Sequence, residues 1–136
     1  VGFAGAIGQP DAHAGEVPCA FVELVEGATT TADELLAYAK EKVPERAAHP
    51  KHMEIMDELP KTAVGKIFKP DLRRSAITRV YNAALAEDGV GAHVVKVVED
   101  KQRGLVARLE KSDAKVTDEA VSEVLGSFIN QWEWVN

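Results

Sequence analysis

Apolar residues form two runs near the start of the chain. The runs cover Val1–Ile7 and Val17–Val25, and a turn rich in Gly, Pro and Asp separates them. Two apolar runs joined by such a turn are typical of a β-hairpin, because Gly and Asp adopt the backbone angles that a tight reversal needs. We therefore expect two neighbouring strands in this part of the chain.

A helical pattern follows the predicted hairpin. Thr31-Ala32-Asp33-Glu34 has the Thr-x-x-Glu form of a capping box, in which the Thr hydroxyl accepts a hydrogen bond from the backbone N–H of the Glu. The helix that starts here is expected to run through Lys42. Its inward face is expected to carry Leu35, Leu36 and Ala39.

A third strand and a longer helix are predicted next. The short apolar run His52–Met56 favours a strand. Pro70 suits the first turn of a helix, because its missing N–H would have no partner there, and Gly89 marks the end of that helix. Apolar residues recur along it at helical spacing: Leu72, Ala76, Val80 and Ala84.

The last third of the chain repeats the order of a hairpin and a helix. Residues 93–99 and 105–110 predict two strands around a polar turn, and Thr117 is the expected N-cap of a helix. We expect Trp132 and Trp134 to pack on the sheet of this extension. The alternative is that they form a docking patch for another domain or subunit.

Together these elements predict an α+β fold. Its first part is a small antiparallel sheet, made of the first hairpin and the third strand and flanked by helices. Its second part is a C-terminal extension made of a hairpin and a helix. A length of 136 residues with 46% hydrophobic content suits one compact unit of this kind.

The overall charge excludes some classes of partner. The formal net charge is -6 and the isoelectric point is about 5.2, whereas a nucleic-acid-binding domain usually has a broad basic face. No apolar run approaches the roughly 18 residues of a membrane span. The single cysteine, Cys19, cannot form an internal disulfide, and its apolar neighbours favour a buried strand position. A reducing cytoplasm is the simplest location for such a chain.

One loop has the opposite charge balance to the rest of the chain. From Lys61 to Arg74 there are five basic residues and one acidic residue, which suggests a site for a small anionic ligand. A phosphate-binding P-loop would need a glycine five residues before the Gly-Lys pair and a Ser or Thr after the lysine. Those positions are occupied by Pro60 and Ile67, so the loop is not a P-loop.

The residues of this loop resemble the C-terminal signature of the adenylate-forming enzymes, which include acyl-CoA synthetases, luciferases and peptide-synthetase adenylation domains. The signature reads Pro-Lys-Thr-x-x-Gly-Lys-Ile-x-(Arg/Lys)-x-x-Leu-Arg, and Pro60–Arg73 matches every specified position. Two upstream turns, Gly8–Asp11 and Gly15–Pro18, are also similar to turns of the family. The resemblance covers roughly residues 1–75, which it identifies as the core of a C-terminal lid domain, and residues 76–136 would be a helix and the extension packed on it.

The resemblance implies a two-step reaction, in which a carboxylate attacks the α-phosphate of ATP to form an acyl-adenylate and the thiol of coenzyme A then displaces AMP. It implies that Lys66 is the catalytic lysine of the first step, with Gly65, Pro60, Lys61 and Thr62 supporting the loop. For Lys61 we expect a solvated position, and a phosphate contact is the alternative. ATP and Mg would be bound mainly by a large N-terminal domain outside this chain, so the chain alone is expected to be inactive.

The resemblance also implies candidate contacts to coenzyme A. Relatives often place residues that touch its nucleotide end just before the third strand, where this chain has Arg46, Lys51 and His52. Many relatives have Lys-x-Pro at this point, whereas this chain has Ala48-His49-Pro50. The spacing of His49 and His52 is one that metals can use, but no cysteine or further histidine is nearby in the sequence, so no metal site is expected.

Three functions are compatible with these residues. The first, which we favour, is the mobile lid of an ATP-dependent acyl-CoA synthetase for fatty or other aliphatic acids, whose partners are the N-terminal domain of the same enzyme, a carboxylic acid, ATP and coenzyme A. The second is the lid of another adenylate-forming enzyme, such as an aryl-CoA ligase or a peptide-synthetase adenylation domain. The third is an interaction module that keeps the loop without catalysis.

Overall fold

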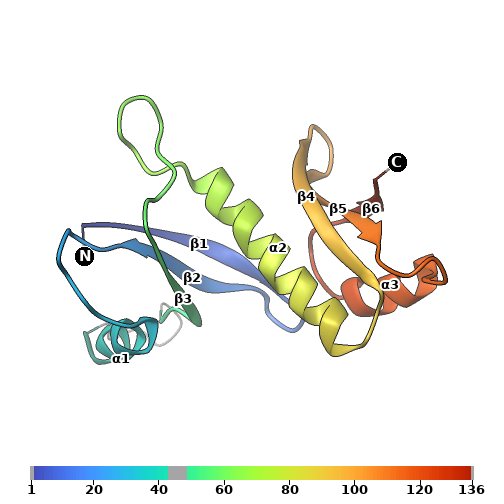
Figure 1. Cartoon of the computed structure of the whole chain (residues 1–136), viewed down its shortest axis with the longest axis horizontal. Helices are drawn as coiled ribbons and strands as arrows, with labels where there is room; N and C mark the ends of the chain where they lie inside the picture. Colours follow the sequence, from blue (N-terminus) through green and yellow to red (C-terminus); the bar gives the residue numbers. More distant parts are fainter. Residues whose placement is uncertain (1, 43–48, 136) are drawn as a thin grey trace. The chain divides into compact units, whose positions relative to one another are not determined.

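A computed structural model describes residues 2–42 and 49–135, which form helices and strands in mixed order. The elements are β1 (Phe3–Asp11), β2 (Gly15–Glu23), α1 (Ala32–Lys42), β3 (His52–Met56), α2 (Lys69–Glu87), β4 (Ala92–Asp100), β5 (Gly104–Lys111), α3 (Asp118–Leu125) and β6 (Trp132–Trp134) (Figure 1). The predicted α+β class is confirmed. Within these residues, no helix combines the length and the apolar character that crossing a membrane requires.

The chain divides into two compact units. The first comprises Val1–Gly8 and Val17–Arg73, and the second comprises Gln9–Glu16 and Arg74–Asn136. The tip of the β1–β2 hairpin therefore belongs to the second unit. The first turn of helix α2 belongs to the first unit, and the rest of the helix belongs to the second unit.

The first unit contains a three-stranded sheet in the order β1–β2–β3. A short turn joins β1 to β2, so these strands run antiparallel, and Gly2 N–H donates to Glu23 O over 2.7 Å. β3 differs from the expected antiparallel sheet because it pairs with β2 in parallel, with Cys19 opposite His52 and Glu23 opposite Met56. The physical reason is the connection: the chain crosses over through α1 and returns in the same direction, as a parallel pair requires.

The buried side chains of the first unit come from the sheet and from the segment that follows β3. They are Ile7, Cys19, Phe21, Val22, Leu59 and Leu72. Gly5 allows this packing, because a Cβ there would lie 2.8 Å from Leu72 Cδ1 and 3.0 Å from Ile67 Cγ2. The first turn of α2 and the end of the preceding loop therefore rest directly on β1.

Helix α1 begins as the sequence predicts, since the Thr31 hydroxyl accepts from Glu34 N–H at 3.2 Å. The helix contacts β3. Its expected inward residues Leu35, Leu36 and Ala39 are only half-buried, and no described residue of α1 is fully buried. α1 therefore packs on β3 without contributing a fully buried residue to the core.

The second unit contains another three-stranded sheet, in the order β4–β5–β6. β4 and β5 form the predicted antiparallel hairpin, and β6 pairs with β5 in parallel, with Ala107 opposite Trp132 and Leu109 opposite Trp134. The two indole rings meet edge to face at 5.1 Å between centroids, and Trp134 Nε1 donates to Asp118 Oδ1 over 2.6 Å. Both tryptophans therefore pack within the extension, as expected.

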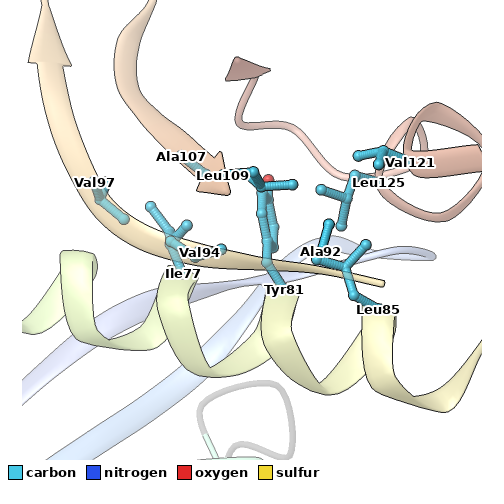
Figure 2. Close-up of a cluster of buried hydrophobic side chains, with 10 residues drawn as sticks. All are labelled: Ile77, Tyr81, Leu85, Ala92, Val94, Val97, Ala107, Leu109, Val121 and Leu125. Atoms are coloured by element: carbon cyan, nitrogen blue, oxygen red, sulfur yellow. The ribbon is translucent and has the colours of Figure 1, made fainter. Parts of the chain in front are cut away.

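The core of the second unit lies where α2 and α3 meet this sheet (Figure 2). From α2 it receives Ile77, Tyr81 and Leu85, whereas the predicted Val80 and Ala84 are only half-buried at its margin. The predicted Leu72 and Ala76 are both buried, so the helical spacing is confirmed in the first half of α2, whereas from Ile77 onward the buried face lies one position further along. Tyr81 is fully buried and its hydroxyl donates to Asn130 O over 2.7 Å, and burial raises the pKa of this hydroxyl.

A test of this core compares two valines of the same strand. Val97 is 8% exposed and belongs to the core, whereas Val95 is 42% exposed. We expect Val97→Ala to lower the free energy of unfolding by about 1.5 to 2 kcal/mol, because two buried methyl groups are lost, and Val95→Ala to change it by roughly 0.5 kcal/mol or less. Urea unfolding followed by tryptophan fluorescence reports on this unit, since both tryptophans lie in it. Equal effects of the two changes would contradict the placement of the core.

Candidate functional site

The signature loop folds into a short hairpin between β3 and α2. Lys61 and Ile67 form an isolated antiparallel bridge. Thr62 N–H donates to Lys66 O over 2.7 Å, and Phe68 N–H donates to Pro60 O over 2.8 Å. The two sides of the loop are thus joined by backbone hydrogen bonds, and Lys66 has a defined backbone position near its tip.

The tip of this hairpin depends on Gly65 and Thr62. Gly65 N–H donates to Thr62 O over 2.9 Å, and Gly65 has a φ of 83°, in the left-handed region. A residue in this conformation commonly ends a three-residue hairpin turn, and a side chain there costs about 1 to 2 kcal/mol. The Thr62 hydroxyl accepts from Lys66 N–H at 3.3 Å. These contacts set the direction in which the Lys66 side chain leaves the loop.

Lys66 is exposed, and none of the ion pairs between described side chains includes it. Val64 beside it is 80% exposed and Phe68 is 37% exposed. The loop therefore exposes an ammonium group, with an exposed apolar residue two positions away on each side in the sequence. Such a group can bind an anion without first breaking an ion pair within the described part of the chain.

Lys61 has a different environment from Lys66. Its Nζ donates to Glu23 Oε1 over 2.8 Å and to Leu59 O over 3.2 Å, and it lies 4.5 Å from the centroid of the Phe3 ring. The Lys61 side chain is 21% exposed. The expected solvated position of Lys61 is therefore wrong, because a carboxylate, a carbonyl and a ring surround its ammonium group.

Glu23 is a residue of this site that the sequence did not reveal. It is the last residue of β2, and its Oε1 accepts from Leu59 N–H and from Lys61 Nζ, both at 2.8 Å. The Lys61 ammonium and then the Leu59 N–H hold the pKa of Glu23 below its usual range. Glu23 and Lys61 are 38 positions apart in the sequence, so only the polar residue closing an apolar strand could have drawn attention to it.

The candidate contacts to coenzyme A lie at the other end of β3. Lys51 precedes this strand, is exposed, and donates its backbone N–H to Pro18 O over 2.8 Å. His52 is half-buried at the start of the strand, and Arg46 lies outside the described residues. A five-residue strand is about 16 Å long, so β3 separates Lys51 from the Lys66 loop. In the described ranges, no cluster of three or more His, Cys, Asp or Glu side chains suits a metal ion.

A comparison with known families matches the part of the chain that contains this loop. Residues 1–66 match the family described as the AMP-binding enzyme C-terminal domain. This segment belongs to that family. The match ends at Lys66 and includes the whole hairpin tip, so the loop is part of the AMP-binding C-terminal domain and not an addition to it.

Known relatives of this AMP-binding C-terminal domain are acyl-CoA ligases and other adenylate-forming enzymes. The marinolic acid–CoA ligase of Pseudoalteromonas sp. (strain SANK 73390) is 38% identical over 135 residues, which are 97% of this chain and 21% of the relative. The probable acyl-activating enzyme 8 of Arabidopsis thaliana is 44% identical over 78 residues, or 56% of this chain and 14% of the relative. The acyl-CoA synthetase structure of Brucella canis matches 59% of this chain and 15% of its own, with 34% identity and a TM-score of 0.52.

The chain thus spans about a fifth, or less, of the length of these relatives. The match to the marinolic acid–CoA ligase covers the second unit as well as the first. The extension after α2 is therefore shared with at least one acyl-CoA ligase.

The conformation of Gly65 can be tested by backbone amide exchange in this chain. We expect Gly65→Ala to speed exchange at Thr62 and Lys66 about fivefold, because roughly 1 kcal/mol of strain favours opening of the hairpin. Gly27→Ala is the matched control: Gly27 also has a φ of 83° and open space around its Cβ position, but lies in another turn. Unchanged exchange in Gly65→Ala would contradict the left-handed conformation.

Proposed function

We propose that this chain is the C-terminal lid of an ATP-dependent acyl-CoA synthetase and that Lys66 is its catalytic residue for adenylation. The observation that carries the proposal is the contrast between the two lysines of the loop. Lys61 is engaged by Glu23, whereas Lys66 is exposed at the end of a hydrogen-bonded hairpin. In this proposal the first unit is the lid core, and the extension belongs to the same lid.

The charge of Lys66 suits the first half-reaction. A carboxylate and a triphosphate repel each other, and negative charge accumulates further when the carboxylate oxygen attacks the α-phosphorus and pyrophosphate leaves. An ammonium group on a long side chain can contact both the attacking carboxylate and the phosphate oxygens. ATP and Mg would be bound mainly by the N-terminal domain of the enzyme, and Lys66 would complete the site from the lid.

The second half-reaction would use another part of the lid. The thiol of coenzyme A attacks the acyl carbon of the adenylate, and AMP leaves. Lys51 lies at the opposite end of β3 from the Lys66 loop, so a rotation of the lid could present one end of the strand in each step. Domain rotations of this kind order reaction steps and exclude water. We assign Lys51, with His52 beside it, to the phosphate end of coenzyme A.

The names of the relatives support coenzyme A as the acceptor. The relative that matches nearly the whole chain is named a marinolic acid–CoA ligase, and the Brucella canis structure is named an acyl-CoA synthetase. The acid substrate would be an aliphatic carboxylic acid. ATP–pyrophosphate exchange by the full-length enzyme with a panel of aliphatic and aromatic acids tests this class, and amino acid activation with transfer to a carrier protein would favour a peptide-synthetase instead.

The proposed role of Lys66 predicts that its replacement slows the first half-reaction and not the second. In the full-length enzyme, Lys66→Ala should lower the rate of adenylation by about 100- to 1000-fold, because a preorganised donor to the transition state is lost. Formation of the thioester from supplied acyl-adenylate should stay within about threefold of the wild type. Lys101→Ala, which removes an exposed lysine in the β4–β5 turn, is the control for net charge. Equal losses in both half-reactions would contradict the assignment.

The proposed role of Lys51 predicts that its replacement affects the second half-reaction and not the first. Lys51→Ala should raise the KM for coenzyme A by roughly 3- to 10-fold, because one exposed contact between an ammonium group and a phosphate contributes about 1 kcal/mol. Pyrophosphate exchange should not change. Lys40→Ala, on the exposed side of α1, removes the same charge elsewhere and should leave both half-reactions intact. Slower pyrophosphate exchange in Lys51→Ala would contradict the assignment of Lys51 to the second half-reaction.

A further inference from the structure

One carboxylate oxygen at the end of β2 binds the base of the Lys66 loop at two points. Glu23 Oε1 accepts from Leu59 N–H and from Lys61 Nζ, each at 2.8 Å. Leu59 is 1% exposed and lies in the core of the first unit. The chain is therefore held by one backbone group and one side chain just before the hairpin begins.

Backbone hydrogen bonds connect this attachment to Lys66. Lys61 forms the bridge with Ile67, and the next residue, Thr62, donates to Lys66 O over 2.7 Å and accepts from Lys66 N–H through its hydroxyl. Ile67 in turn lies over β1 at Gly5. A displacement of Lys61 would therefore move the backbone from which the Lys66 side chain extends.

The attachment is shielded from water more than a surface ion pair is. The side chains of Glu23 and Lys61 are 17% and 21% exposed. The ring of Phe3 lies 4.5 Å from Lys61 Nζ and covers one side of the pair. Partial desolvation strengthens a charge-assisted hydrogen bond, and the backbone donor from Leu59 restricts the carboxylate to one position. The geometry thus favours a fixed clamp over a fluctuating surface contact.

We infer that Glu23 is a positioning residue for Lys66: its carboxylate clamps Leu59 and Lys61 and thereby fixes the hairpin that delivers the catalytic lysine. The inference rests on the proposed function of Lys66. It assigns Lys61 to the clamp and not to a substrate phosphate. In this role Glu23 acts through the loop and not by contact with substrate.

The clamp predicts a specific kinetic signature for Glu23→Gln in the full-length enzyme. The amide oxygen can still accept from Leu59 N–H, so the fold is kept, but the attraction to Lys61 is lost. Adenylation should slow in kcat by roughly 10-fold or more, because small displacements of a catalytic group cost up to about 100-fold. The KM values for ATP and acid, and the thioester half-reaction, should stay within about twofold of the wild type.

Two further variants make the test specific. Glu26→Gln removes an exposed carboxylate three positions away and should change nothing. Lys61→Met should reproduce the effect of Glu23→Gln, and the double variant should be no slower than either single one, because both changes break the same clamp. Additive losses, or a higher KM for ATP in Lys61→Met, would show that Lys61 binds substrate and would overturn the inference.

A measurement without catalysis separates this inference from the proposed function. In this chain, Glu23→Gln should speed amide exchange at Thr62 and Lys66 by at least about threefold, while exchange in β4 and β5 stays unchanged. Unchanged exchange at the loop would overturn the clamp even if Lys66→Ala abolishes adenylation. Faster exchange together with an active Lys66→Ala enzyme would retain the clamp and reject the proposed function. Equal loss of both half-reactions in Glu23→Gln, with general loss of exchange protection, would show a purely structural role.

Discussion

The bonds from the Glu23 carboxylate to Leu59 and Lys61 are the constraint on which the geometry of the site depends. They form because β3 runs parallel to β2: the register places Met56 opposite Glu23, so the chain that continues from β3 passes the end of β2. A carboxylate at that end meets a backbone donor and an ammonium group at once. Without the parallel pairing, the signature loop would contain the same residues but would lack the two bonds to Glu23.

The same constraint gives two lysines of one loop different environments. Lys61 and Lys66 have the same intrinsic chemistry, and their spacing places both near the hairpin. Lys61 is held by a carboxylate, a carbonyl and an aromatic ring, so its charge serves the structure. Lys66 lies beyond the turn at Gly65, where the described side chains offer no carboxylate within ion-pair distance. The two ammonium groups thus differ in environment although the residue type is the same, and the roles that we propose for them rest on this difference.

Local signals in the sequence were sufficient for most of the secondary structure. Thr31 and Thr117 accept hydrogen bonds at the starts of their helices, Pro70 lies in the first turn of α2, and the second hairpin reverses at its polar turn. What the sequence could not show were partners that are distant along the chain. A period of two identifies the faces of a strand but not its neighbour, so the parallel pairing of β3 was missed. The bond of Glu23 to Lys61 depends on that pairing and was missed with it.

The apolar residues of α2 explain why the extension is needed. Its first turn contributes Leu72, which packs over Gly5 in the first unit, and its remaining turns contribute Ile77, Tyr81 and Leu85 to the second core. A chain that ended after α2 would leave these three large side chains in water, at a cost of about 2 kcal/mol each. Tyr81 would also lose the carbonyl of Asn130 as its acceptor. The helix that follows the signature loop therefore depends on the extension to bury its Ile77, Tyr81 and Leu85 side chains.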